Sequence, residues 1–279
     1  MEIVGGSETA HYLLAGRAAA DGVEYAWIQK DASANTKGIE EGMSQDALCS
    51  AESPYPIRTY WFGAEPSERT SVKLAERAGR LARVYGWLNL PAPTSGAAAA
   101  FPYRLEMREL GAKNAGRTAK SATQGHDYGL FLVATGAIPE SFRSQWVYVE
   151  GISCDGRGVL LYPVSGQNNF QPKLLGHDWP TEVDLTGRAE TLTVDKPFGL
   201  DTYVLLTTSS QLSDLSVFDF EGAMSRGMPA PDPLARLLGS ASSGGTRGIG
   251  SKAPADWSVQ YLHILSVPQK QSGSSPAKN

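Results

Sequence analysis

Two cysteines and two short histidine-containing segments are the residues of this chain best suited to chemistry. Cys154 lies in the stretch Ser-Cys-Asp-Gly-Arg-Gly, where a catalytic cysteine would need a histidine base and a group that orients this base. Two Gly-His-Asp segments contain the pairs His126–Asp127 and His177–Asp178. Each pair suits a metal site or a base with its orienting carboxylate. Each equally suits a turn in which the aspartate bonds its own backbone.

The surroundings of Cys154 favour a turn over a catalytic centre. Residues 145–153 alternate like a strand, and residues 158–164 form a second apolar run. Between them, Asp155-Gly156 is a hairpin signal, because glycine adopts positive φ without a steric penalty. The caspase-type signature Gln-Ala-Cys-[Arg/Gln/Gly]-Gly is not met. We therefore expect Cys154 to end a strand and to be dispensable, and we assign no catalytic residue.

The cysteine count and the composition narrow the classes of function. Two cysteines, Cys49 and Cys154, are few for a secreted disulfide scaffold of 279 residues. We expect both to be free thiols, with no disulfide, no bound metal and no cofactor. With 25 basic and 29 acidic residues, the chain lacks the excess of positive charge that is typical of nucleic-acid-binding proteins. Because no apolar run could span a bilayer and residues 1–12 show no signal-peptide pattern, we expect a cytoplasmic chain without nucleic-acid or membrane partners.

Short strands dominate the secondary structure that the sequence predicts. The candidate strands are rich in Val, Leu, Ile, Tyr and Trp and are separated by turns of Gly, Asp and Pro. They cover residues 11–18, 23–29, 55–63, 103–110, 128–136, 145–153, 158–164, 182–187, 189–194, 201–210 and 257–267. Many short strands of this kind indicate an antiparallel β-sandwich.

One long amphipathic helix is predicted in the N-terminal part, over residues 67–90. Its apolar face would consist of Leu74, Ala78, Leu81, Tyr85 and Leu88, which follow one another at steps of three and four. A short helix is expected over residues 232–240. The fold class is therefore mainly β (α+β). We divide the chain into an N-terminal strand-and-helix subdomain (1–93), a C-terminal β-sandwich domain (101–268) and a disordered tail (269–279).

The order of the aromatic strands resembles a known type of domain. The stretches WVYVEGISCDGRGVLLYPV and PFGLDTYVLLTT carry the most specific part of the resemblance, which runs from His11 to Pro268. They are similar to the β-rich domain of unknown function that follows the protease domain in bacterial caspase-family (metacaspase-like) proteins. The residues that fit the hairpin of that domain are Asp155, Gly156, Leu160, Leu161, Tyr162 and Pro163. The catalytic histidine and cysteine motifs of the protease domain have no counterpart here.

The resemblance implies a non-catalytic accessory or regulatory region of a bacterial caspase-like cysteine protease. Its partner would be the caspase-like protease domain, in cis or in trans, or a protein substrate of that domain. The alternative is an independent enzyme or metal-binding protein with a site around the two Gly-His-Asp segments. Such a site needs both His-Asp pairs within a few ångströms of each other.

Trp179, together with His177 and Asp178, is the interaction site that the sequence suggests. Trp179 lies in a loop flanked by glycine and proline, and loops on a rigid β scaffold often carry binding residues. The other interpretation is a tryptophan that attaches a long loop to the sandwich, because tryptophan usually buries its ring.

Overall fold

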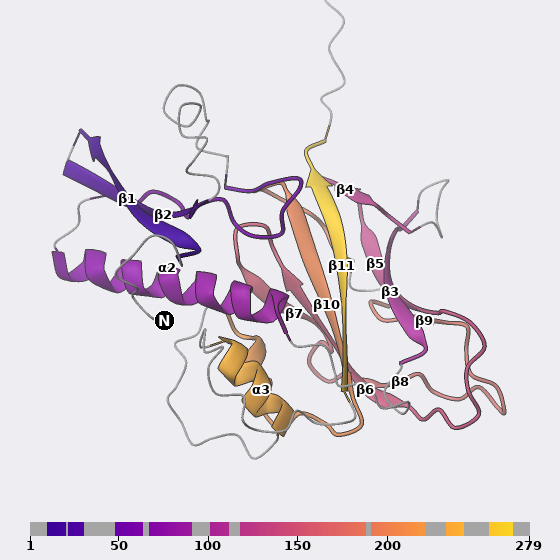
Figure 1. Ribbon diagram of the computed structural model, residues 1–279. Helices are drawn as coiled ribbons and strands as arrows, with labels where there is room; N and C mark the ends of the chain where they lie inside the picture. The colour runs from indigo at the N-terminus through magenta and orange to yellow at the C-terminus, as the bar shows by residue number, and fades with distance from the viewer. Residues whose placement is uncertain are drawn as a thin grey trace, which may run out of the picture.

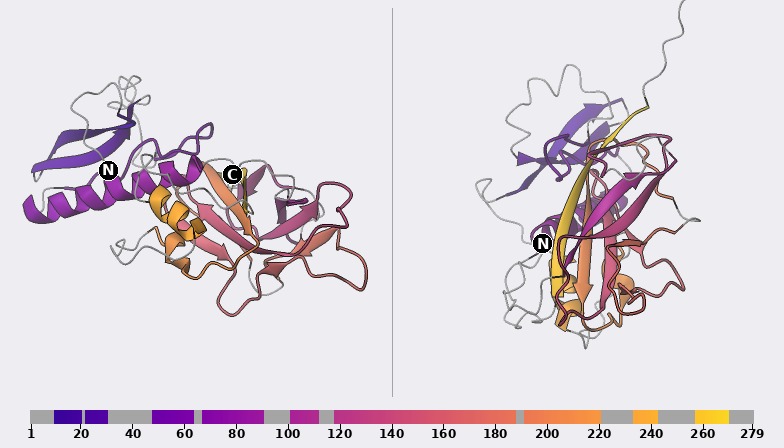
Figure 2. Two further views of the ribbon diagram at one scale, coloured as in Figure 1. Left: turned by 60° about the horizontal axis from the view of Figure 1, so that its bottom comes forward. Right: turned by 90° about the vertical axis from the view of Figure 1, so that its right-hand side faces the viewer.

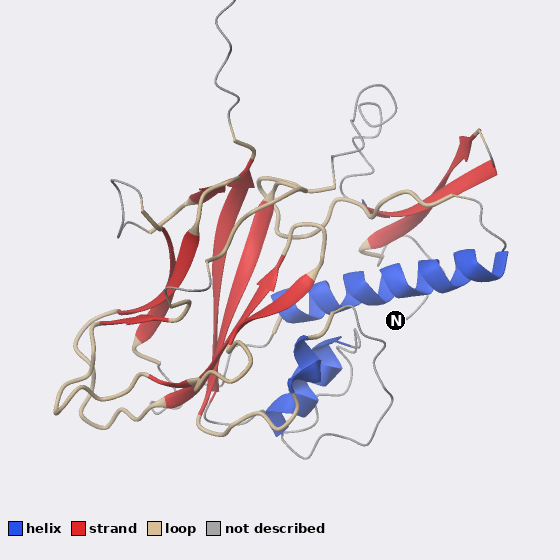
Figure 3. Cartoon of the chain, turned by 180° about the vertical axis from the view of Figure 1, so that it is seen from behind, coloured by secondary structure: helices blue, strands red, loops and turns tan. Residues whose placement is uncertain are grey.

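Three layers of secondary structure make up the computed structural model (Figure 1). The structure describes residues 10–20, 22–30, 48–63, 67–90, 101–111, 118–187, 191–220, 233–242 and 257–269. Two antiparallel sheets pack face to face, and the helices cover the outer face of the larger sheet (Figure 3). This arrangement confirms the predicted fold class, mainly β with one longer helix.

The helices and strands have the following bounds. The strands are β1 (Tyr12–Ala19), β2 (Gly22–Gln29), β3 (Tyr103–Glu109), β4 (Ser121–Thr123), β5 (Tyr128–Ala134), β6 (Gln145–Ile152), β7 (Gly158–Tyr162), β8 (Phe170–Gln171), β9 (Glu182–Asp184), β10 (Leu200–Thr208) and β11 (Trp257–Val267). The helices are α2 (Ser67–Leu88), α3 (Pro233–Ser242) and the 3₁₀ turn η2 (Leu215–Phe218).

The larger sheet has six strands and provides the scaffold for the features discussed below. Its order is β4-β11-β10-β6-β7, and β8 pairs with β6 beside β7. All pairs in it are antiparallel except β11 with β4. The smaller sheet has the order β3-β5-β9, and β1 and β2 form a separate antiparallel ribbon. The ribbon and α3 lie on opposite sides of α2 (Figure 2).

Both faces of the six-stranded sheet are buried, which explains the continuous apolar runs in β6 and β10. Successive side chains of a strand point to opposite faces. Val147 and Val149 of β6 therefore pack between the sheets, whereas Tyr148 and Ile152 pack toward the helices. The core between the sheets includes Tyr103, Leu105, Met107, Tyr128, Leu130, Leu132, Val147, Val149, Tyr203, Leu205 and Ile264.

Helix α2 is joined to the β-sheets by its C-terminal half. Val84 and Trp87 pack in the core on the helix side of the six-stranded sheet, and the Trp87 ring lies 5.4 Å from that of Phe218. The Arg83 guanidinium donates to the carbonyls of Asp219 and Phe220 at 3.0 and 2.8 Å. The buried face thus contains Ala78, Leu81, Val84 and Trp87 rather than Tyr85 and Leu88, which are only half-buried.

Two predicted strands are shorter or absent. Residues 55–63 make only isolated bridges to β2, at Arg58 and Phe62. Within residues 189–194 a single bridge joins Leu192 to Tyr128, and residues 188–190 lie outside the described part. The predicted tail beyond residue 269 and the boundary at 93–101 also fall almost entirely outside the described residues, so the division into subdomains remains a prediction.

Candidate functional site

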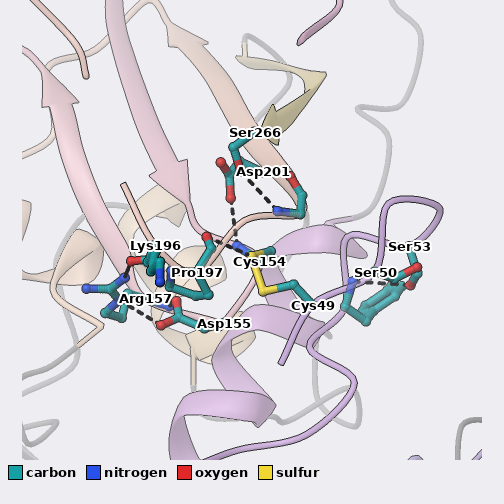
Figure 4. Close-up of a disulfide and its surroundings, with 12 residues drawn as sticks. Cys49, Ser50, Ser53, Cys154, Asp155, Arg157, Lys196, Pro197, Asp201 and Ser266 are labelled. Carbon is teal, nitrogen blue, oxygen red and sulfur yellow. Dashed lines mark hydrogen bonds and ion pairs between the residues drawn. A yellow bond between two sulfur atoms is a disulfide. The ribbon is translucent and has the colours of Figure 1, made fainter. Parts of the chain in front are cut away.

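Cys49 and Cys154 form a disulfide bond (Figure 4). Their Cα atoms lie 5.3 Å apart although 105 positions separate them in the sequence. The segment around Cys49 is held there because the Leu200 N–H donates to the Ser50 carbonyl at 2.8 Å. The expectation of two free thiols without a disulfide is therefore wrong. The bond also gives Cys154 a structural role beyond the turn, which a variant without the bond would test. A sulfur held in this bond is not available as a nucleophile.

The turn predicted after β6 is present and depends on Gly156. The Gly156 N–H donates to the Ser153 carbonyl at 2.7 Å, and the Ser153 N–H donates to the Arg157 carbonyl at 2.8 Å. The φ angle of Gly156 is +84°, a conformation that favours glycine. Strand β6 ends at Ile152, so Cys154 lies in the turn, two residues after the strand, rather than at its end as predicted. This turn packs against α2, since a Cβ at Gly156 would lie 3.2 Å from Val84 Cγ2.

Replacing Gly156 with valine should lower the free energy of unfolding by about 1 to 3 kcal/mol. A Cβ at this position would have an unfavourable φ and would lie 3.2 Å from Val84 Cγ2 and 3.3 Å from Pro56 Cγ. Thermal melts measure the effect. Gly136→Val is the matched control, because a Cβ there meets nothing within 4 Å and φ is not positive. Equal melting temperatures for the two variants would contradict the prediction.

The two Gly-His-Asp segments lie at opposite ends of β5. His126 Nδ1 is 2.7 Å from Glu109 Oε1, and Asp127 immediately precedes β5. The second segment leads into Thr181, whose carbonyl accepts from the N–H of Ala134 at the other end of this strand. Seven strand residues span about 23 Å. The structure therefore does not bring the two pairs together.

Each Gly-His-Asp segment has a local structural role. The Asp127 carboxylate accepts from Thr191 Oγ1 at 3.1 Å. In the second segment, Leu175 and Asp178 exchange backbone hydrogen bonds of 3.0 and 3.3 Å around a tight turn that begins at Gly176, with φ +67°. No group of three or more His, Cys, Asp or Glu side chains that could hold a metal occurs within the described ranges.

Trp179 anchors this turn to the sandwich. Its half-buried ring meets that of Phe142 edge-on, with centroids 4.9 Å apart. Next to it, Tyr103 Oη donates to the Pro180 carbonyl at 2.7 Å. His177 and Asp178 are exposed at the tip. Of the two interpretations of Trp179, the contacts match the one in which the ring attaches the loop to the core.

Two leucines that the sequence reading overlooked make the tip of the turn apolar. The side chains of Leu174 and Leu175 are 51% and 69% exposed. We call residues 174–179 the Leu174–Trp179 turn. A pair of adjacent leucines just before Gly-His-Asp was the available signal, but an exposed leucine cannot be told from a buried one by sequence alone.

A cavity of about 430 Å³ lies beside the disulfide. Strands β6, β7 and β10 form one wall, and residues 192–197 form the other. Asp201 is the most buried carboxylate in the lining. Its Oδ1 accepts from the Cys154 N–H at 2.8 Å (Figure 4). Burial raises the pKa of Asp201 to about 6, although the hydrogen bonds from Cys154 and Ser266 oppose this shift.

The cavity was not foreseen because its lining comes from two separated parts of the chain, residues 151–161 and 192–203. Arg157 and Lys196 contribute cations, and Asp195, unlike Asp201, contributes an exposed carboxylate. Volumes of several hundred cubic ångströms with a few convergent polar groups are typical of small-ligand sites.

Comparison with protein-family models, with curated proteins and with solved structures finds no match for this chain. Within the residues that the structure describes, no helix is long and apolar enough to cross a membrane.

Proposed function

We propose that this chain is a non-catalytic accessory region of a caspase-like cysteine protease and binds the protease domain through the Leu174–Trp179 turn. The observation that carries this proposal is the exposed pair Leu174 and Leu175 on a turn fixed by Trp179. Apolar side chains presented by a rigid scaffold suit protein contacts. The choice of partner rests on the sequence resemblance described above.

The chemistry of the described residues supports a binding role over catalysis. Cys154 is held in the disulfide, and the two His-Asp pairs lie at opposite ends of β5. The alternative, one enzyme or metal site around both Gly-His-Asp segments, therefore gains no support from the geometry. His177 and Asp178 would instead form the polar surroundings of the two leucines in a contact surface.

The disulfide also bears on where the chain would act. The sequence favoured the cytoplasm and free thiols, but structural disulfides rarely persist in reducing compartments. The Cys49–Cys154 bond supports an oxidising compartment instead. A protease domain that binds this chain would have to share that compartment.

The test mixes the purified chain with a caspase-like protease domain encoded together with it. We expect co-elution on a sizing column and a changed rate of cleavage of a protein substrate. Leu175→Asp should weaken the complex at least tenfold, because an exposed leucine that becomes buried in a contact contributes about 1.5 to 3 kcal/mol.

Leu215→Asp is the matched control, since Leu215 is a similarly exposed leucine, at 42%, in η2 on the helix side of the sheet. It should leave co-elution unchanged. If neither co-elution nor a change in cleavage is seen, the accessory role is wrong. If Leu175→Asp and Leu215→Asp behave alike, the Leu174–Trp179 turn is not the contact.

A further inference from the structure

Strand β7 leaves one edge of the six-stranded sheet unpaired. It pairs with β6 on one side, and no other described strand or isolated bridge contacts its outer edge. Such an edge presents N–H and C=O groups that an extended peptide can pair with. The side chains of β7 are apolar, and Val159 is 54% exposed.

The cavity described above lies against β7. Val159 and Leu161 of β7 line it, and Leu192 and Val194 face them from the other wall. In a strand added beside β7, alternate side chains would point to the same face as Val159 and Leu161. An apolar side chain of that peptide would thus enter the cavity, which is the combination of edge and pocket by which added strands are recognised.

Two cations lie where β7 begins. Arg157 immediately precedes the strand, and Asp155 holds its guanidinium through contacts of 2.9 and 3.1 Å. The same guanidinium lies 3.4 Å from the Lys196 carbonyl (Figure 4), so Arg157 and Lys196 are neighbours at this end of the cavity.

The carboxylates of the lining are engaged elsewhere. Asp201 accepts from the Cys154 N–H, and Asp195 accepts from Gln124 Nε2 at 3.2 Å. Within the described residues, no carboxylate forms an ion pair with the Lys196 ammonium. Arg157 is paired with Asp155, so Lys196 is the cation that an anion at the start of β7 would meet.

We propose that β7 and the adjoining cavity bind the C-terminal end of an extended peptide from another protein. A peptide antiparallel to β7 ends at the start of β7, which places its terminal carboxylate between Arg157 and Lys196. Its backbone pairs with the free edge, and an apolar side chain near its end occupies the cavity. This site uses other residues than the Leu174–Trp179 turn and does not depend on the proposed protease partner.

The test uses a fluorescein-labelled hexapeptide of alternating threonine and valine that ends in valine with a free carboxylate. Its binding to the disulfide-bonded chain is followed by fluorescence polarisation. We expect saturable binding, a loss of at least tenfold when the C-terminus is amidated, and a similar loss when the alternate backbone amides are N-methylated. Charge-assisted contacts to the carboxylate and backbone pairing account for these two losses.

Two pairs of variants locate the site on the chain. Lys196→Glu should abolish the preference for the free carboxylate, whereas Lys173→Glu, at another exposed lysine, should not. Val159→Asp should weaken binding at least tenfold, whereas Val72→Asp should not, because Val72 is an equally exposed valine (53%) on α2. Failure of every peptide to bind overturns the proposal, as does equal binding of the acid and the amide, or equal effects within either pair of variants.

Discussion

A chain in which alanine replaces both Cys49 and Cys154 is expected to unfold with a free energy lower by about 4 to 5 kcal/mol. The bond closes a loop spanning 105 positions, and in the chain-entropy model a loop of about this length contributes close to 4.7 kcal/mol by restricting the unfolded state. Both cysteines lie where the segment 48–50 meets the end of β6. Denaturant unfolding followed by tryptophan fluorescence measures the difference.

The oxidised and reduced forms of the unaltered chain provide the control. Thiol titration under denaturing conditions should count no free thiol before reduction and two after it. The reduced chain should then unfold close to the double variant, and each single alanine variant should match the double variant, because either one removes the bond. An oxidised chain with two free thiols, or a double variant as stable as the original, contradicts the bond.

Gly199 explains why the disulfide fits into this part of the fold. A Cβ at Gly199 would clash with the Cβ of Cys49 and would lie 3.1 Å from the Cβ of Cys154. The Gly199 N–H donates to Ser266 Oγ, and the Ser266 N–H donates to the Gly199 carbonyl. The start of β10 is thus fixed against β11 while its missing side chain leaves room for the bond.

Local patterns predicted most strands, whereas contacts between distant segments could not be predicted. Alternation and turn residues located β3, β5, β6, β7 and β10, because those signals involve neighbours in sequence. They missed β4 and β8, which have three and two residues and exist only through pairing with β11 and β6. An alternation of apolar and polar residues can be recognised only in longer segments than these.

The disulfide and the cavity were missed for the same physical reason. The residues that neighbour Cys49 and Cys154 in the sequence do not indicate that the two cysteines are close in space. Their proximity depends on the hydrogen bond from the Leu200 N–H to the Ser50 carbonyl and on the packing of both cysteines against Gly199. The buried face of α2 also differs from the predicted one. Val84 and Trp87 pack against residues that follow β10, and the spacing of apolar residues within one helix does not indicate what lies outside it. The Gly156 turn, by contrast, is a local feature and was predicted.

Glu150 is the least expected residue in the sandwich, because it is fully buried on β6 and points toward the helix side of the sheet. Neither carboxylate oxygen has a hydrogen-bond partner among the described residues. A Cβ at Gly158 would lie 2.7 Å from Glu150 Oε1 and would clash with the Phe220 ring, so these groups are closely packed. An isolated buried carboxylate is costly, and such a group avoids ionisation by keeping its proton.

Burial raises the pKa of Glu150 from its ordinary 4.5 to about 9, and the negative charge of Asp219 adds to the effect. Below pH 4.5 the folded and unfolded chains both hold this proton. As pH rises from 4.5 toward 9, the unfolded chain releases the proton and the folded chain retains it, so the free energy of unfolding falls. The free energy of unfolding falls by about 1.36 kcal/mol for each pH unit above 4.5, so at pH 7 it has fallen by about 3 kcal/mol.

Glu150→Met should therefore stabilise the chain by about 3 kcal/mol at pH 7, and this gain should shrink toward pH 4. Methionine keeps the length of the side chain and removes both the charge and the unpaired polar atoms. Glu150→Gln removes the charge but leaves a buried amide without partners, so it should flatten the pH dependence while stabilising less. Denaturant unfolding at pH 4, 5.5, 7 and 8.5 separates the two effects, with Glu140→Met at an exposed glutamate as the control. Two results would instead mean that Glu150 is ionised and paired in the folded chain. One is a lower free energy of unfolding for Glu150→Met than for the original chain at pH 7. The other is a free energy of unfolding that falls as much between pH 5 and 8.5 in Glu150→Met as in the original chain.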